Sequence, residues 1–317
     1  MRATPREETV RLLREVGFIV KSYEGVKDYC FSVVAKKGRI TLLIKCIPTL
    51  DSFTSTAASE LREVAHKTQS TPLIVTSDIS LEKGIVYKRY RINAVNYSTL
   101  SEALAEGKYP LIYAERGGFY VTIDGEKLHR ARVAKGLSLG EVAESIGVSR
   151  KAIYEYERGC MASTPEVVLK LELLLGEDLA KPINFLKWHP EPGKVKRKAL
   201  SKDLIGKVAM ALKKWGFSVS IFKRTPFEAA ALNDIKRDKL ILKEVKWGNE
   251  LEFKEVKLSS DFAKEVDARL VVLAKSREVK YEVESIKEDF LILNGKGIEE
   301  VKRKGIKALE GGCPLNH

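Results

Sequence analysis

The sequence contains few of the residues that build metal sites and disulfide frameworks. Its 317 residues include four cysteines and four histidines, which are dispersed along the chain without paired spacing: Cys30, Cys46, Cys160, Cys313, His66, His129, His189 and His317. We therefore expect neither a zinc site nor a disulfide framework. Because no cofactor motif is present either, we expect a protein that works without a metal or a cofactor.

Long apolar runs are also missing. No stretch reaches the roughly 18 residues that a membrane-spanning helix requires, and the first five residues lead into a predicted helix rather than a signal peptide. These absences predict a soluble, cytoplasmic protein. Gln69 is the only glutamine, and charged residues make up 31% of the chain, a composition typical of hyperthermophiles.

The chain is strongly basic, with 56 Lys and Arg residues against 43 Asp and Glu, a net charge of +13 and a pI near 9.4. The excess is unevenly distributed. Residues 1–123 carry +5, residues 124–182 carry −1, residues 183–257 carry +9, and residues 258–317 are neutral. Such charge suits binding to a polyanion by counterion release, and solubility alone is the alternative.

Residues 139–158 have the spacing of a helix-turn-helix. Ala143 is small where two helices would cross, and Gly147 permits the positive φ of a tight turn. Ser149 would cap the second helix, as Ser138 would cap the first. A preceding helix from Leu128 and a fourth helix that starts at Pro165 and ends at Gly176 complete a core of about fifty residues.

This segment resembles the DNA-binding domain of the lambda repressor and Cro family, also called the XRE type. In that family the second helix of the motif reads base edges in the major groove, which implies this role for Ser149, Arg150, Lys151 and Tyr154. A solvated outer helix face is the alternative. The resemblance also implies a structural ion pair between Arg132 and Glu157.

The sequence departs from this family at one position. Many members have a glutamine that binds phosphate where this chain has Leu139. Either the phosphate contact has moved, to Arg158 or Lys135, or Leu139 packs against a neighbouring domain.

The flanking sequence contains a repeat. Gly17-Phe18, residues 42–45 and Leu73 match Gly216-Phe217, residues 240–243 and Leu270 at offsets of 199, 198 and 197 residues. Each copy predicts a helix, three strands, a second helix and a strand. The predicted parts are strands at 19–23, 29–35, 40–47 and 72–76 with a helix at 57–68, and strands at 218–222, 227–232, 239–245 and 270–274 with a helix at 260–267. A chance match of common α/β patterns is the alternative to duplication.

This order of elements is similar to the restriction-endonuclease-like fold, which includes archaeal junction resolvases. The resemblance implies a metal held by two acids near a strand lysine. Asp28 and Lys45 fit, but Leu43 replaces the second acid, and the second copy has Phe227 and Ile241 at the acid positions before Lys243. Without paired carboxylates the metal has no ligands. We therefore expect both copies to be inactive and to pair protomers, with direct contact to the duplex as the second possibility.

These observations predict an α/β plus all-α protein with an inactive nuclease-like domain at 1–123, a helix-turn-helix domain of four to five helices at 124–186, a linker at 187–199 and a second nuclease-like domain at 200–317. The linker is rich in Pro, Gly and Lys, and its basic residues Lys196, Arg197 and Lys198 are candidate DNA contacts, although a solvated linker is equally plausible.

The whole pattern is similar to an archaeal family of helix-turn-helix transcriptional regulators. The resemblance implies a homodimer that binds specific sequences in double-stranded DNA. A nuclease targeted by the helix-turn-helix, and a non-specific architectural nucleic-acid-binding protein, remain alternatives. The sequence identifies no effector and no operator.

Overall fold

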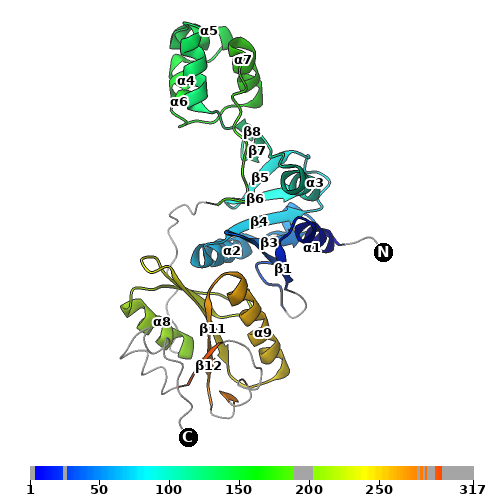
Figure 1. Ribbon diagram of the computed structural model, residues 1–317, viewed down its shortest axis with the longest axis vertical. Helices are drawn as coiled ribbons and strands as arrows, with labels where there is room; N and C mark the ends of the chain where they lie inside the picture. The colour runs from blue at the N-terminus through cyan, green and yellow to red at the C-terminus, as the bar shows by residue number, and fades with distance from the viewer. Residues whose placement is uncertain are drawn as a thin grey trace. The chain divides into compact units, whose positions relative to one another are not determined.

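The computed structural model describes residues 4–23, 27–188, 203–276, 279–280, 283 and 290–294. The chain divides into two compact units, and Figure 1 labels many of their helices and strands. One contains residues 1–46, 53–73 and 186–317, and the other contains residues 47–52 and 74–185. Lys196, Arg197, Lys198 and the rest of the predicted linker from residue 189 onward lie outside the described residues.

The N-terminal part of the first unit begins with α1 (Pro5–Glu15), which starts at a capping box between Thr4 and Glu7. The elements that follow are β1 (Ile19–Ser22), β2 (Val33–Lys37), β3 (Ile40–Ile47), α2 (Ser55–Thr68) and β4 (Thr71–Thr76). The strands lie in the order β1-β2-β3-β4, with β1, β2 and β3 antiparallel. Strand β2 begins at Val33, later than the Tyr29 that the sequence suggested.

The C-terminal part of the same unit repeats this order. It contains α8 (Leu204–Lys214), β9 (Ser218–Ile221), β10 (Ala229–Asn233), β11 (Asp238–Val245), α9 (Glu250–Glu265) and β12 (Arg269–Ala274), followed by β13 (Leu291–Leu293). Strands β9, β10 and β11 are antiparallel, whereas β12 is parallel to both β11 and β13. Helix α9 begins ten residues earlier than the sequence suggested because Asn249 caps it.

The turn after the first helix is the same in both parts. Gly17 (φ 86°) and Gly216 (φ 82°) both adopt a left-handed conformation that few other residues tolerate. Each is followed by a buried phenylalanine, Phe18 or Phe217. The repeat seen in the sequence is therefore a repeat of element order and of local backbone conformation.

The two parts of the first unit pack on each other reciprocally. Helix α2 lies against β9 and β10 of the C-terminal part, and α9 lies against β2 of the N-terminal part. At the centre, the rings of Phe31 and Phe262 stack with centroids 5.2 Å apart. At the rim, the Glu60 carboxylate accepts hydrogen bonds from the backbone N–H groups of Lys223 and Arg224. The two repeated parts therefore contact each other within one chain.

The second unit begins with a 3₁₀ turn, η1 (Leu50–Ser52), and with the end of β4. It continues with β5 (Ile85–Arg89), β6 (Ile92–Asn96), α3 (Tyr97–Ser101), a π-helical turn η2 (Glu102–Glu106), β7 (Ile112–Glu115) and β8 (Gly118–Val121). These four strands lie in the order β6-β5-β7-β8. Strands β5 and β6 form one antiparallel hairpin, β7 and β8 form another, and β5 pairs with β7 in parallel.

Four helices complete the second unit: α4 (Gly125–Ala134), α5 (Leu139–Ile146), α6 (Arg150–Glu157) and α7 (Pro165–Leu175). Their boundaries follow local signals. Asp124, Ser138 and Ser149 each accept an N-terminal backbone hydrogen bond, while Gly147 and Gly176 end α5 and α7 in left-handed conformations. Among the described helices, none combines the length and apolar character needed to cross a bilayer.

Candidate nucleic-acid interface

Helix α6 is held by one face and exposes the other. Ile153 and Tyr156 are buried in the core that joins α4 to α7. The Ser149 hydroxyl accepts a hydrogen bond from the backbone N–H of Ala152 (3.1 Å), which fixes the start of the helix. Because the buried positions lie on one face, the side chains of the first two turns on the other face project from a rigid support.

The exposed face of α6 carries the residues suggested for base reading. Arg150 and Lys151 are exposed, and within the described part of the chain neither forms an ion pair. Tyr154 is 47% exposed, and the Arg158 guanidinium lies 5.4 Å from its ring centroid. Ser149, Arg150, Lys151 and Tyr154 thus lie together at the N-terminal half of one helix.

Arg132 and Glu157 lie in contact beneath this face. Arg132 Nε donates to Glu157 Oε1 (2.5 Å), Nη2 donates to Glu157 Oε2 (3.1 Å), and Nη1 donates to the backbone carbonyl of Leu137 (2.8 Å). The arginine therefore joins α4, α6 and the segment before α5. Burial raises the pKa of Glu157, but the hydrogen bonds from Arg132 and His129 outweigh it and hold the pKa below its usual value.

The remaining candidates of the helical module have separate positions. Ser138 forms a capping box with Glu141 at the start of α5. Lys135 donates to the backbone carbonyl of Leu174 (2.8 Å), so its ammonium group lies at the C-terminal end of α7. Leu139 packs on the core of its own module. This contact lies within the module, whereas the sequence suggested packing against a neighbouring domain as one alternative.

The nuclease-like position in the N-terminal part contains one acid and one lysine. Lys45 Nζ lies 2.7 Å from Asp28 Oδ1 and 2.6 Å from the backbone carbonyl of Tyr29. Leu43, which replaces the second acid, is fully buried and pairs with Val34 in the sheet. The Lys45 hydrogen bond lowers the pKa of Asp28, so the acid is ionised and paired with the lysine.

The equivalent lysine of the C-terminal part is buried between two carboxylates. Lys243 is 1% exposed, and its Nζ lies 3.0 Å from Glu228 Oε1 and 2.6 Å from Glu255 Oε2. The other oxygen of Glu255 accepts from Lys27 (2.6 Å) and from the Tyr29 hydroxyl (3.3 Å), both in the N-terminal part. This cluster therefore also joins the two repeated parts.

Sequence reasoning missed Glu228. It placed the buried Phe227 at the first acid position, whereas the next residue supplies the carboxylate. Burial raises the pKa of Glu228 despite the nearby Lys243, while the hydrogen bonds from Lys243 and Lys27 overcome burial and lower the pKa of Glu255. No group of three or more His, Cys, Asp or Glu side chains with metal-binding geometry occurs in the described residues.

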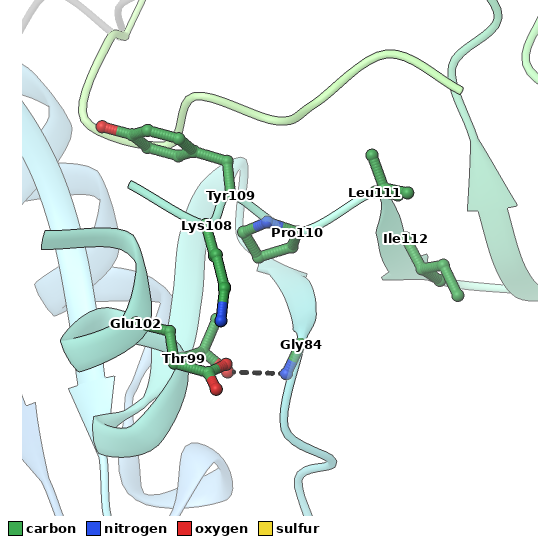
Figure 2. Close-up of a pocket in the computed structure, with 8 residues that line it drawn as sticks. All are labelled: Gly84, Thr99, Glu102, Lys108, Tyr109, Pro110, Leu111 and Ile112. Carbon is green, nitrogen blue, oxygen red and sulfur yellow. Dashed lines mark hydrogen bonds between the residues drawn. The ribbon is translucent and has the colours of Figure 1, made fainter. Parts of the chain in front are cut away.

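Two pockets lie in the second unit. One, of about 440 Å³, lies beside α4 and the second half of α6 and is lined by Glu126, His129, Arg130, Tyr154, Glu157 and Arg158. The other, of about 300 Å³, lies beside η2 and β7 (Figure 2). Figure 2 shows Lys108 beside Glu102, with the Thr99 hydroxyl accepting a hydrogen bond from the Gly84 amide (2.9 Å). In this pocket the positive charge of Lys108 and the negative charge of Glu102 offset each other.

The sequence matches two known domain families. Residues 2–110 match the PD-(D/E)XK superfamily domain, and residues 128–181 match the helix-turn-helix. The chain therefore combines a nuclease-like domain with a helix-turn-helix, which confirms both resemblances seen in the sequence.

Curated relatives match over most of their length. A "Putative HTH-type transcriptional regulatory protein" of Methanocaldococcus jannaschii is 33% identical over 89% of this chain and 89% of its own. Proteins with the same description from Pyrococcus furiosus (35% identical, 89% and 90% covered) and Archaeoglobus fulgidus (29% identical, 93% and 98% covered) also match. The chain belongs to this archaeal family of HTH-type transcriptional regulatory proteins. No solved structure matches it.

Proposed function

We propose that the protein is a transcriptional regulator that binds specific sequences in double-stranded DNA. The observation that carries this proposal is the exposed face of α6, where two cations without ion-pair partners among the described residues and one tyrosine project from a capped, well-supported helix. A major groove admits such a helix. Because its target would be chromosomal DNA, we place the protein in the cytoplasm.

Each side chain has a distinct role in this proposal. Arg150 forms a bidentate pair with the O6 and N7 atoms of a guanine. Lys151 contacts a guanine or a phosphate, and Tyr154 contacts a thymine methyl group or a backbone oxygen. Ser149 and the first N–H groups of α6 face a phosphate, which helix N-termini favour. Arg158 lies further along the same helix as a backbone contact.

We further propose that the protein binds as a homodimer, because one module contacts too few bases to select a site in a genome. A two-fold axis would place two α6 helices about one turn of DNA apart. The contact between the two repeated parts occupies α2 and α9 within each chain. We therefore place the dimer contact on other surfaces of the flanking domains, of which the C-terminal part is a second nuclease-like copy.

Titration with DNA tests the base-reading role of Arg150. Arg150→Ala should cost about 1–3 kcal/mol per half-site on a duplex selected by the wild type, and much less on a scrambled duplex. Lys170→Ala is the matched control, because it removes the same charge from α7, where Lys170 pairs with Glu166. Equal loss on both duplexes in Arg150→Ala would contradict base reading, and equal affinity of the wild type for both would favour an architectural protein.

The PD-(D/E)XK match makes a nuclease the second candidate function. We propose that the protein does not cleave DNA, because Leu43 and Ile241 stand where a second acid is needed and are both buried. Incubation with duplex, branched and single-stranded DNA in magnesium or manganese tests this proposal. Cleavage that disappears in a folded Lys45→Ala variant would refute it for the N-terminal copy, and cleavage that disappears in a folded Lys243→Ala variant would refute it for the C-terminal copy.

A further inference from the structure

The helix-turn-helix module does not supply the positive field that DNA binding needs. Residues 124–182 contain one more acid than base, and several of their cations have partners inside the module. Lys127 lies 3.3 Å from Glu177, Arg132 pairs with Glu157, and Lys170 lies 3.0 Å from Glu166. Because non-specific affinity for DNA comes from neutralised phosphates, another surface must contribute.

The two β-hairpins of the same unit carry cations and tyrosines in two groups of contacts. Residues 85–96, which form β5 and β6, include three basic residues and no acid. Lys88 Nζ lies 4.0 Å from the centroid of the Tyr113 ring on β7. That ring stacks on Tyr120 of β8 at 5.6 Å. At the β5–β6 turn, the Arg89 guanidinium lies 4.9 Å from the ring of Tyr90.

The acids that pair with Lys88 and Arg89 are mostly in solvent. Glu115 lies 3.5 Å from Lys88 and Asp51 lies 3.1 Å from Arg89, with side chains 52% and 94% exposed. Ion pairs at such exposure contribute little to stability. A phosphate group can therefore replace each acid at small cost.

The hairpins are fixed to the helix-turn-helix within one unit. Val121 at the end of β8 forms an antiparallel bridge with Ser163, and Ile123 forms one with Ala180. The Ser163 hydroxyl donates to the Tyr156 hydroxyl of α6 (2.9 Å). Tyr120 directly precedes Val121, and Tyr113 and Lys88 lie on the next two strands of the sheet, which are spaced about 5 Å apart. The row formed by Tyr120, Tyr113 and Lys88 therefore begins next to the module and extends about 10 Å, the length of roughly three base pairs.

We propose that this hairpin surface, formed by Lys88, Arg89, Tyr90, Arg91, Tyr113 and Tyr120, binds the sugar–phosphate backbone of the DNA that flanks the site read by α6. The cations neutralise phosphates, and the tyrosine hydroxyls donate hydrogen bonds to phosphate oxygens. The contact is independent of base sequence, so it raises affinity and fixes the orientation of the module. This inference rests on the proposed function.

Salt-dependent titration of the full-length protein tests the surface. The test variant combines Lys88→Gln, Arg89→Gln and Arg91→Gln. The control variant combines Lys83→Gln, Lys108→Gln and Lys170→Gln, which removes the same charge from lysines of the same unit that pair with Glu102, Glu106 and Glu166. Each protein is titrated against a selected duplex trimmed to the helix-turn-helix site and against the same site with ten flanking base pairs on each side.

On the flanked duplex, log K of the test variant should fall less steeply with log salt, by about 2 to 3 units of slope. Its affinity at 0.15 M salt should be about fivefold lower for each lost contact. On the trimmed duplex it should match the wild type, and the control should match the wild type on both. Circular dichroism melting checks that the variants are folded.

An unchanged slope on the flanked duplex overturns the hairpin contact and leaves the proposed function intact. Equal effects of the test and control variants also overturn it, because general charge would then explain the loss. If the wild type does not distinguish the selected site from scrambled DNA, the proposed function fails, and the flanking contact defined by that site fails with it.

Discussion

Removal of the Arg132 guanidinium should open the helix-turn-helix locally. This group joins three segments through bonds to both oxygens of Glu157 and to the carbonyl of Leu137, and the two side chains are 11% and 10% exposed. Breaking a buried ion pair from one side costs about 3–5 kcal/mol because the other charge is left uncompensated. Since Glu157 keeps its contact with His129 (2.9 Å), we expect a loss of stability at the lower end of this range, about 3 kcal/mol.

Amide exchange measured by mass spectrometry resolves this change, because it reports on α6 separately from the rest of the chain. A loss of about 3 kcal/mol corresponds to roughly 150-fold faster exchange of the most protected α6 amides in Arg132→Leu. Arg132→Lys should give an intermediate result because it keeps the charge but loses the fork of donors. The exposed pair Lys170–Glu166 on α7 is the control, and its removal should change exchange by less than about threefold.

The same pair predicts a pH dependence. The pKa of Glu157 is lowered in the folded protein, so the ionised carboxylate stabilises the fold fully above its unfolded pKa of about 4.3. That contribution disappears as the pH falls through the lowered folded pKa. In Glu157→Gln the stability of α6 should lack this dependence on pH. Two results together would refute the reasoning: amide exchange of α6 in Arg132→Leu within threefold of the wild type, and a pH dependence of α6 stability in Glu157→Gln that matches the wild type.

Substitutions at four further residues have distinct expected results. Ser149→Ala should cost about 1 kcal/mol of α6 stability in amide exchange, whereas Ser149→Asp should keep the cap but weaken duplex binding by repelling phosphate. Gly125→Ala should destabilise the module in thermal melting, because its Cβ would lie 2.2 Å from the backbone oxygen of Glu157. In the control Gly140→Ala the nearest atom to the new Cβ is 3.8 Å away, so this variant should gain up to about 1 kcal/mol of stability. Lys243→Met should lower the stability of the first unit by about 3–5 kcal/mol, because Glu255, whose pKa is lowered, would lose the buried ammonium group that it pairs with; an unchanged urea midpoint would contradict this.

The helical module could be predicted from the sequence because each of its boundaries depends on a local signal. Ser138 and Ser149 cap helices, and Gly147 and Gly176 end them, within one or two residues of the expected positions. The nuclease-like repeat could be recognised for a similar reason, since Gly17 and Gly216 require the same positive φ. Both depend on chemistry within a few residues of the chain.

Contacts between distant segments could not be predicted in this way. The Glu255 carboxylate meets Lys27, more than two hundred residues away, only because α9 lies against β2. Glu228 was missed because β10 starts two residues later than the repeat suggested, at Ala229, and the buried Phe227 was aligned with the acid. The stacking of Lys88, Tyr113 and Tyr120 depends in turn on the parallel pairing of β5 with β7, which no local pattern encodes.

The two lysines of the repeat differ in a way that bears on the proposed absence of nuclease activity. Lys45 keeps its side chain 14% exposed beside the largely exposed Asp28, so this copy lacks only a second acid. Lys243 is buried between Glu228 and Glu255, and Glu255 is also bound from the N-terminal part. Lys243 is 1% exposed, and Glu255 also accepts hydrogen bonds from Lys27 and Tyr29 of the N-terminal part. In the second copy Glu255 therefore belongs to the contact between the two parts, and an acid restored at the buried Ile241 would leave the lysine buried.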